Sequence, residues 1–291
     1  MKGKWVFGTL TVCLLAVACI EQQKRVIQSV SISSSSSDNA LEDSLATDAD
    51  TLLLDEEFSD EPLPSNVDEV FDDFLFLFEH SNRFQRHRVR FPLPITDAEG
   101  NRQELNRNQW THHSMSLGQE FCTVLWNYRR QIDLSMDENQ QQARVEHIYL
   151  HSRIVESFGF ERDSLSGEWN LISQSSIPFD EYPQSDFLDF YRDFATDSAF
   201  QRRHVHDPLR FTMASEDSEE EPIEGTIDVD QWFEFAPELP KAVLVNIQYG
   251  QQFSNPNRMV MQMRGFSDSM QNIFVFQRNA NGRWRLTEFE N

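Results

Sequence analysis

The hydrophobic positions from residue 66 onward first recur with the period of a helix and later with the period of a strand. In "SNVDEVFDDFLFLFEH" the apolar residues share one helical face, with Asn66 as the expected N-cap. Further along, "TVLWNYRRQIDL", "ARVEHIYLHSRI", "KAVLVNIQY" and "RMVMQMRGF" alternate apolar and polar residues or carry strand-forming residues. A helix followed by hairpin-linked strands predicts an α+β fold, with the helix packed on a curved antiparallel sheet.

The whole pattern occurs twice. When the chain is shifted by 116 residues, a 23-residue window shows ten identities, whereas average composition would give roughly one or two. The identical pairs are Phe71/Phe187, Asp73/Asp189, Phe74/Phe190, Phe78/Phe194, Phe84/Phe200, Gln85/Gln201, Arg86/Arg202, Val89/Val205, Pro92/Pro208 and Leu93/Leu209. Trp110 and Trp232 match at a spacing of 122, and Trp169 and Trp284 match at 115. The sequence therefore predicts two tandem α+β domains, residues 66–178 and 183–291, produced by an internal duplication.

The repeated motif "FQRHRVRFPL" or "FQRRHVHDPL" marks the end of each predicted helix. Pro92 and Pro208 cannot continue a helix and push the preceding residue toward extended geometry. The motif is therefore interpreted as a helix-to-strand corner. The phenylalanine stripe on the preceding helix is interpreted as core, with a ligand cavity as the alternative.

The N-terminal segment has the features of an export signal. Lys2 and Lys4 precede a short apolar run that ends in "LLAVAC", which resembles the bacterial lipobox, with Cys19 as the lipidated residue. Residues 1–18 are therefore predicted to be a lipoprotein signal peptide, with an ordinary signal peptide as the alternative. Residues 19–65 include a five-serine run and a dense acidic stretch, and we expect a disordered tether there.

The net charge of −23 restricts the partners. Such an acidic chain is repelled by phosphate backbones, so the sequence predicts no nucleic-acid binding. Once Cys13 is removed and Cys19 carries lipid, Cys122 remains alone, so we expect no intrachain disulfide. The apolar surroundings in "FCTVLW" favour a buried, inert thiol at Cys122.

Polar and aromatic residues shared by both repeats are the candidates for ligand binding. A Gln–Arg pair at each corner can satisfy buried carbonyls, hold a carboxylate such as Asp73 or Asp189, or bind an anionic or amide ligand. The tryptophans can fill a core or form the floor of a pocket. The candidate ligand-binding residues are Gln85, Arg86, Trp110, Gln201, Arg202 and Trp232.

The histidines suggest two weaker arrangements. His147 and His151 share one strand face, but the sequence indicates no third or fourth metal ligand. The segment with His112 and His113 suggests a Cys–His pair with Cys122. The sequence fixes no geometry for this pair and identifies no third group that would orient the histidine. The sequence therefore predicts no catalytic residue, no metal site and no cofactor.

The lipobox, the acidic linker, the duplicated "FQR–V–PL" motif and the closing "F-x-F…G-x-W" hairpin are similar to those of an uncharacterised family of Bacteroidetes lipoproteins. The resemblance covers roughly residues 67–291. It implies tandem cone-shaped domains of the nuclear-transport-factor-2-like, or cystatin-like, type. Because no acidic block follows Cys19, the resemblance implies an outer-membrane lipoprotein that faces the periplasm.

The sequence supports three functional hypotheses. The favoured one is a lipid-anchored, non-enzymatic envelope protein that binds a small molecule or a protein. The alternatives are a hydrolase- or isomerase-like enzyme using one cone pocket, and a structural partner in an envelope assembly. A deep pocket with convergent titratable side chains would indicate an enzyme, whereas cones filled by Phe and Trp would exclude both a cone-pocket enzyme and the binding of a small ligand in the cones.

Overall fold

A computed structural model describes residues 67–213, 222–267 and 269–291. The predicted signal peptide, Cys19 and the tether, residues 1–65, lie outside the described residues, as does most of the acidic insertion after residue 213. None of the helices in the described ranges has the length and apolar character needed to span a membrane.

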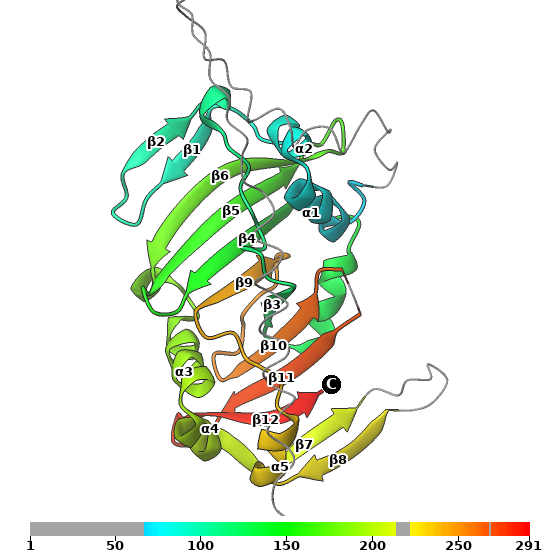
Figure 1. Ribbon diagram of the computed structural model, residues 1–291, viewed down its shortest axis with the longest axis vertical. Helices are drawn as coiled ribbons and strands as arrows, with labels where there is room; N and C mark the ends of the chain where they lie inside the picture. The colour runs from blue at the N-terminus through cyan, green and yellow to red at the C-terminus, as the bar shows by residue number, and fades with distance from the viewer. Residues whose placement is uncertain (1–66, 214–221, 268) are drawn as a thin grey trace, which may run out of the picture. The chain divides into compact units, whose positions relative to one another are not determined.

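The first repeat begins with two helices and continues as strands and short 3₁₀ turns (Figure 1). Its elements are α1 (Phe71–His80), α2 (Asn82–His87), β1 (Leu93–Thr96), β2 (Arg102–Leu105), η1 (Arg107–Gln109), β3 (Phe121–Trp126), η2 (Arg129–Met136), β4 (Gln142–Tyr149), β5 (Ile154–Arg162), β6 (Trp169–Pro178) and η3 (Phe179–Glu181). The predicted N-cap at Asn66 is wrong. Helix α1 begins four residues later than this cap would require, because the N-cap residue Val70 has an extended backbone.

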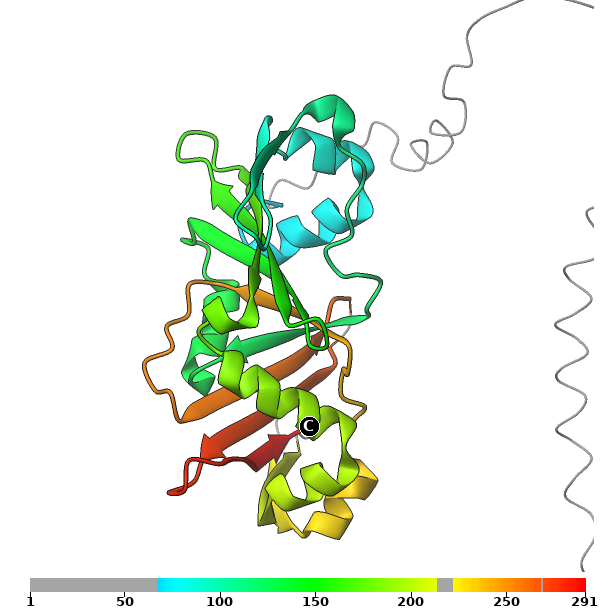
Figure 2. The ribbon, with the colours of Figure 1, turned by 90° about the vertical axis from the view of Figure 1, so that its left-hand side faces the viewer.

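The second repeat has the same order of strands after its two helices. Its elements are α3 (Ser185–Thr196), α4 (Ser198–His204), β7 (Val205–Met213), β8 (Ile223–Ile227), α5 (Val229–Phe235), β9 (Val243–Gln248), β10 (Arg258–Gly265), β11 (Gln271–Arg278) and β12 (Trp284–Glu290). Helix α5 takes the place of η1, and η2 has no counterpart among the described residues between β9 and β10. The predicted helix-to-strand corner is present in both repeats, with a cis peptide before Pro92 and before Pro208. Seen from the side, α1 and α2 lie against one face of their sheet (Figure 2).

The two repeats exchange one strand. The described residues form two six-stranded sheets with the orders β2-β1-β6-β5-β4-β9 and β3-β10-β11-β12-β7-β8. Strand β9 of the second repeat pairs antiparallel with β4, and β3 of the first repeat pairs antiparallel with β10. Each sheet therefore contains five strands from one repeat and one strand from the other, and β3 and β9 lie side by side where the sheets meet (Figure 1).

The α+β class is confirmed, and the sheets are largely antiparallel as predicted. One pairing in each sheet is parallel, β1 with β6 and β7 with β12, because the chain returns to the start of the repeat after a long excursion. The parallel pair lies at the equivalent place in both sheets, which again reflects the duplication.

The phenylalanine stripes form the cores, as the sequence predicts. Phe71, Phe74 and Phe78 are fully buried against Phe160 and Trp169, with ring centroids about 5 Å apart for Phe71 and Trp169. In the second repeat Phe187, Phe190 and Phe194 pack in the same way on Phe276 and Trp284. The interior between helix and sheet is thus largely filled by aromatic rings in both repeats.

Candidate functional site

Gln85 lies inside the protein and holds a loop in place. Its side chain is fully buried. Its Nε2 donates to the carbonyl oxygens of His113 (2.8 Å) and Phe78 (3.0 Å), and its Oε1 accepts from the His113 N–H (2.9 Å). Gln85 therefore satisfies backbone groups, which is the structural role considered for it, and it positions His113.

The two candidate arginines lie on the surface. Arg86 is exposed and its guanidinium is 3.5 Å from the carbonyl oxygen of Arg107. Arg202 pairs with Asp230 and lies over the ring of Phe233. Arg202 does not hold Asp189, which was one of the roles considered for it, because Asp189 pairs with Arg153 and Arg192.

The candidate tryptophans are buried. Trp110 packs on Phe91, and Trp232 packs on Phe289 with ring centroids 5.1 Å apart. Gln201 is half-buried in α4. None of the six candidate residues lines the cavity that lies beside α1, so the residues shared by the repeats do not gather there.

This cavity, at the junction of the repeats, has a volume of about 570 Å³. Its walls come from one face of α1, the loop before β3, the exchanged strand β9 and the turn after β10. Apolar wall residues include Leu75, Phe76, Ile247 and Phe266. The cavity has the size of pockets that bind small molecules.

A charged network closes one side of this cavity. Arg264 Nη1 donates to Asp72 Oδ2 (2.6 Å), and the hydroxyl of Tyr249 donates to Asp72 Oδ1 (2.5 Å). Burial, followed by the charge of Asp72, raises the pKa of Tyr249 well above its ordinary value. Burial also raises the pKa of Cys122, a second wall residue, to about 11, so this thiol is protonated and inert, as the sequence predicts.

Glu79 fixes the loop that forms the rim of the cavity. Its carboxylate accepts from the hydroxyls of Ser114 and Ser116 (both 2.7 Å) and from the N–H groups of Met115 (2.5 Å) and Ser116 (3.3 Å). Burial alone would raise the pKa of Glu79, but these hydrogen bonds lower it below its ordinary value. The loop is thereby held against α1 by an ionised carboxylate.

For each of the four polar wall residues, the matching position in the other repeat is apolar. The wall residues Asp72, Glu79, Cys122 and Arg264 correspond to Leu188, Ala195, Leu244 and Ile148. All four of these counterparts are buried in the second core. The polar cavity therefore belongs to one half only, and sequence reasoning missed it because it searched for residues that the repeats share.

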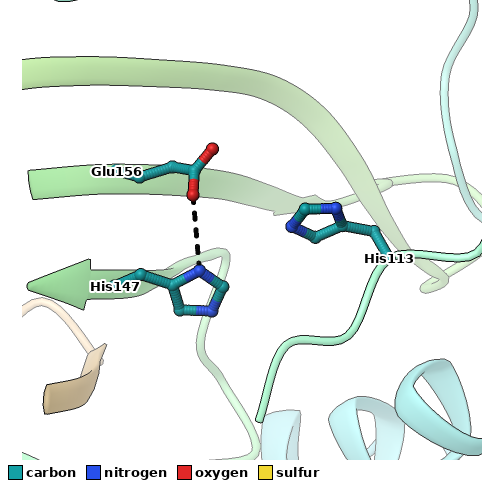
Figure 3. Close-up of side chains that lie close together, drawn as sticks. All are labelled: His113, His147 and Glu156. Carbon is teal, nitrogen blue, oxygen red and sulfur yellow. Dashed lines mark ion pairs between the residues drawn. The ribbon is translucent and has the colours of Figure 1, made fainter. Parts of the chain in front are cut away.

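A second polar group lies on the first sheet, where His113, His147 and Glu156 approach one another (Figure 3). His147 is on β4, Glu156 is on β5, and His113 is in the loop before β3. Each offers one donor atom, and these atoms all lie within 4.8 Å of one another. Across the described ranges, this is the one set of three His, Cys, Asp or Glu residues arranged closely enough to hold a metal ion.

The histidine pairings considered from the sequence are wrong. His151 is exposed in the turn after β4 and lies outside the group around His147, because the strand ends at Tyr149. His113 joins His147 instead of forming a pair with Cys122. Burial lowers the pKa of His113.

Comparison with known proteins identifies relatives without a described activity. Residues 49–291 match the family described as "Domain of unknown function (DUF4348)". The chain is 36% identical to an NTF2-like protein from Bacteroides fragilis NCTC 9343, whose crystal structure superposes with a TM-score of 0.71 over 79% of this chain and 98% of that chain. No curated protein matches the chain. The predicted NTF2-like fold is thus confirmed.

Proposed function

Because this chain belongs to DUF4348, a family of domains of unknown function, we propose a function from its own geometry: it binds a small amphipathic molecule in the cavity beside α1. In this proposal it is a non-enzymatic protein of the cell envelope, anchored by lipid on Cys19 and facing the periplasm from the outer membrane. In this proposal the lipid on Cys19 is the only part of the protein that attaches it to the membrane.

The observation that carries the proposal is the difference between the repeats at this cavity. The second core shows that the same backbone accepts dense apolar packing around Leu188 and Ile148, the counterparts of Asp72 and Arg264. Burying the Asp72–Arg264 pair, which joins α1 to β10, is less favourable than such packing, since desolvation offsets much of the attraction between the charges. A polar cavity kept in place of a well-packed core supports a binding role.

The wall chemistry favours binding over catalysis. Asp72 and Tyr249 are engaged with Arg264, Glu79 accepts four hydrogen bonds, and the Cys122 thiol is protonated. A catalytic acid, base or nucleophile needs to be available to a reacting group. Apolar walls on one side and the polar network on the other suit an amphipathic molecule that makes both kinds of contact.

The ligand-binding proposal can be tested at Phe76, which lines the cavity and is 45% exposed. The substitution Phe76→Glu removes apolar contact and adds a charge, so we expect bound small molecules to fall at least about tenfold. The measurement is mass spectrometry of small molecules extracted from the purified full-length protein. Phe235→Glu is the matched control, since Phe235 is 56% exposed and lies outside the cavity lining.

The wild type and the Phe235→Glu variant are both expected to retain the bound molecule. If no molecule accompanies the wild type, or if Phe76→Glu leaves the amount unchanged, the proposal fails.

Lipid anchoring is tested at the two cysteines of the leader segment. We expect Cys19→Ala to move the protein from the membrane fraction to the soluble fraction, because the acyl chains provide the membrane attachment. Cys13→Ala is the control and should leave the protein with the membranes, since Cys13 precedes the predicted cleavage site. Fractionation with immunoblotting measures both. Membrane association that persists in Cys19→Ala would contradict the assignment.

A further inference from the structure

His147 is held in one tautomer by the backbone. Its Nε2 lies 2.9 Å from the carbonyl oxygen of Met115. A carbonyl oxygen only accepts hydrogen bonds, so Nε2 carries the proton of the neutral ring. The other ring nitrogen, Nδ1, then presents a lone pair.

That lone pair faces a carboxylate. His147 Nδ1 lies 3.5 Å from Glu156 Oε2 (Figure 3). His147 is fully buried, and within the described part of the chain its Nδ1 has no hydrogen-bond partner. Two electron-rich atoms that face each other in the interior repel unless a positive charge lies between them.

His113 directs a second unsatisfied nitrogen into the same region. Its ring stacks toward His147 with centroids 6.1 Å apart and contacts Phe158. Its Nε2 is buried and, among the residues described, makes no hydrogen bond. A single proton on His147 Nδ1 would satisfy His147 and Glu156 but would leave His113 Nε2 unsatisfied, whereas a metal ion would accept all three donors.

We propose that His113, His147 and Glu156 form a binding site for a divalent metal ion of the zinc type. Two imidazole nitrogens and one carboxylate oxygen are a ligand set that suits Zn²⁺, and three protein ligands leave one coordination position for a further ligand. Harder ions such as Mg²⁺ and Ca²⁺ prefer oxygen ligands and suit the set less well.

The surrounding groups orient each ligand as they do in metal sites. Met115 fixes the His147 ring through its carbonyl, and Gln85 holds the backbone of His113 through two hydrogen bonds. The Gln174 amide donates to Glu156 Oε1 (2.8 Å). Such outer partners fix tautomer and orientation before the ion arrives.

The second repeat does not carry this set. The positions that correspond to His113, His147 and Glu156 are occupied by Phe235, Met263 and Asn272. The site therefore belongs to the first repeat alone. It is a separate feature from the cavity lining, so it does not depend on the ligand proposed above.

The experiment is a zinc titration of the purified full-length protein, after chelator treatment, in competition with a chromophoric chelator. We expect the wild type to bind one equivalent of Zn²⁺. His113→Gln, His147→Gln and Glu156→Gln should each weaken binding at least about tenfold. His151→Gln is the matched control and should bind like the wild type, because His151 is exposed and outside the group.

The titration also separates this site from weak binding by surface carboxylates. If zinc binds equally to the wild type and to the His113→Gln and Glu156→Gln variants, the ion is held elsewhere and the proposal is overturned. Failure of the wild type to bind zinc overturns it as well. If His147→Gln does not fold, the variants His113→Gln and Glu156→Gln, at partly exposed positions, decide the result. Phe76→Glu should leave zinc binding unchanged, which distinguishes this test from that of the cavity.

Discussion

Neither repeat is expected to fold as a monomer when residues 66–178 or 183–291 are expressed alone. Each fragment would lack the strand that completes its sheet, β9 in the first case and β3 in the second. It would also expose the apolar side chains of the strand that it normally contributes to the other sheet, β3 in the first case and β9 in the second. We expect circular dichroism and denaturant titration to show no cooperative unfolding of a monomeric fragment.

The size of this effect follows from the burial of the exchanged strands. Leu244, Val245 and Ile247 of β9 are almost completely buried among residues that include the first repeat. Each such side chain contributes about 1.5–3 kcal/mol, so their loss removes roughly 5–9 kcal/mol. A domain has only about 5–15 kcal/mol of total stability, so the loss approaches the whole of it.

Co-expression of the two fragments provides the control. Both exchanged strands are then available, so a 1:1 complex with cooperative unfolding is expected. A fragment can also recover a partner strand by forming a dimer with its own copy, which light scattering would detect. A stable, cooperatively folded monomer of either fragment would contradict the prediction.

The second large effect is expected at Glu146, a carboxyl group buried where the repeats meet. It accepts from the Tyr182 hydroxyl (2.7 Å) and the Asn246 amide (2.7 Å) and is 1% exposed. Glu146→Leu leaves these donors unpaired at about 1–3 kcal/mol each, so we expect unfolding free energy to fall by roughly 2–6 kcal/mol. Glu146→Gln keeps an oxygen acceptor and should lose less. Chemical denaturation followed by tryptophan fluorescence measures both, and an equal loss would point to packing instead.

Glu146 should also make stability depend on pH. Burial raises its pKa in the folded state above the ordinary value of 4.5, despite the hydrogen bonds that lower it. The folded protein therefore holds this proton more tightly than the unfolded chain does. The stability that the protonated group contributes is complete below 4.5 and is lost as pH rises through the folded-state pKa. The unfolding free energy of the wild type relative to Glu146→Gln should therefore decrease as pH rises from 4.5.

Local patterns predicted the elements but not the exchange of β3 and β9. Both strands are short apolar runs, and such a run fits beside β4 or β10 equally well by periodicity. The choice depends on long-range contacts, such as the Asn246 side chain that accepts from the Leu125 N–H (2.9 Å). Contacts of this kind leave no mark in the spacing of residues along the chain.

The sites escaped prediction for a related reason. His113, His147 and Glu156 come from a loop and two strands, and the fold alone brings them together. Residues shared by the repeats, such as Gln85 and Trp232, proved to be buried and structural. The reason is that both halves of a duplicated fold keep the residues that each half needs for folding. Residues that differ between the halves, such as Asp72 opposite Leu188, carry the polar cavity.

The exchange of β3 and β9 gives this single chain the arrangement of a strand-swapped dimer whose two subunits have been joined. In a symmetric homodimer every substitution appears in both subunits, so a polar cavity that weakens one core weakens the other as well. Joining the subunits removes that constraint. One half can then specialise for binding while its partner keeps an apolar core and stabilises the shared fold.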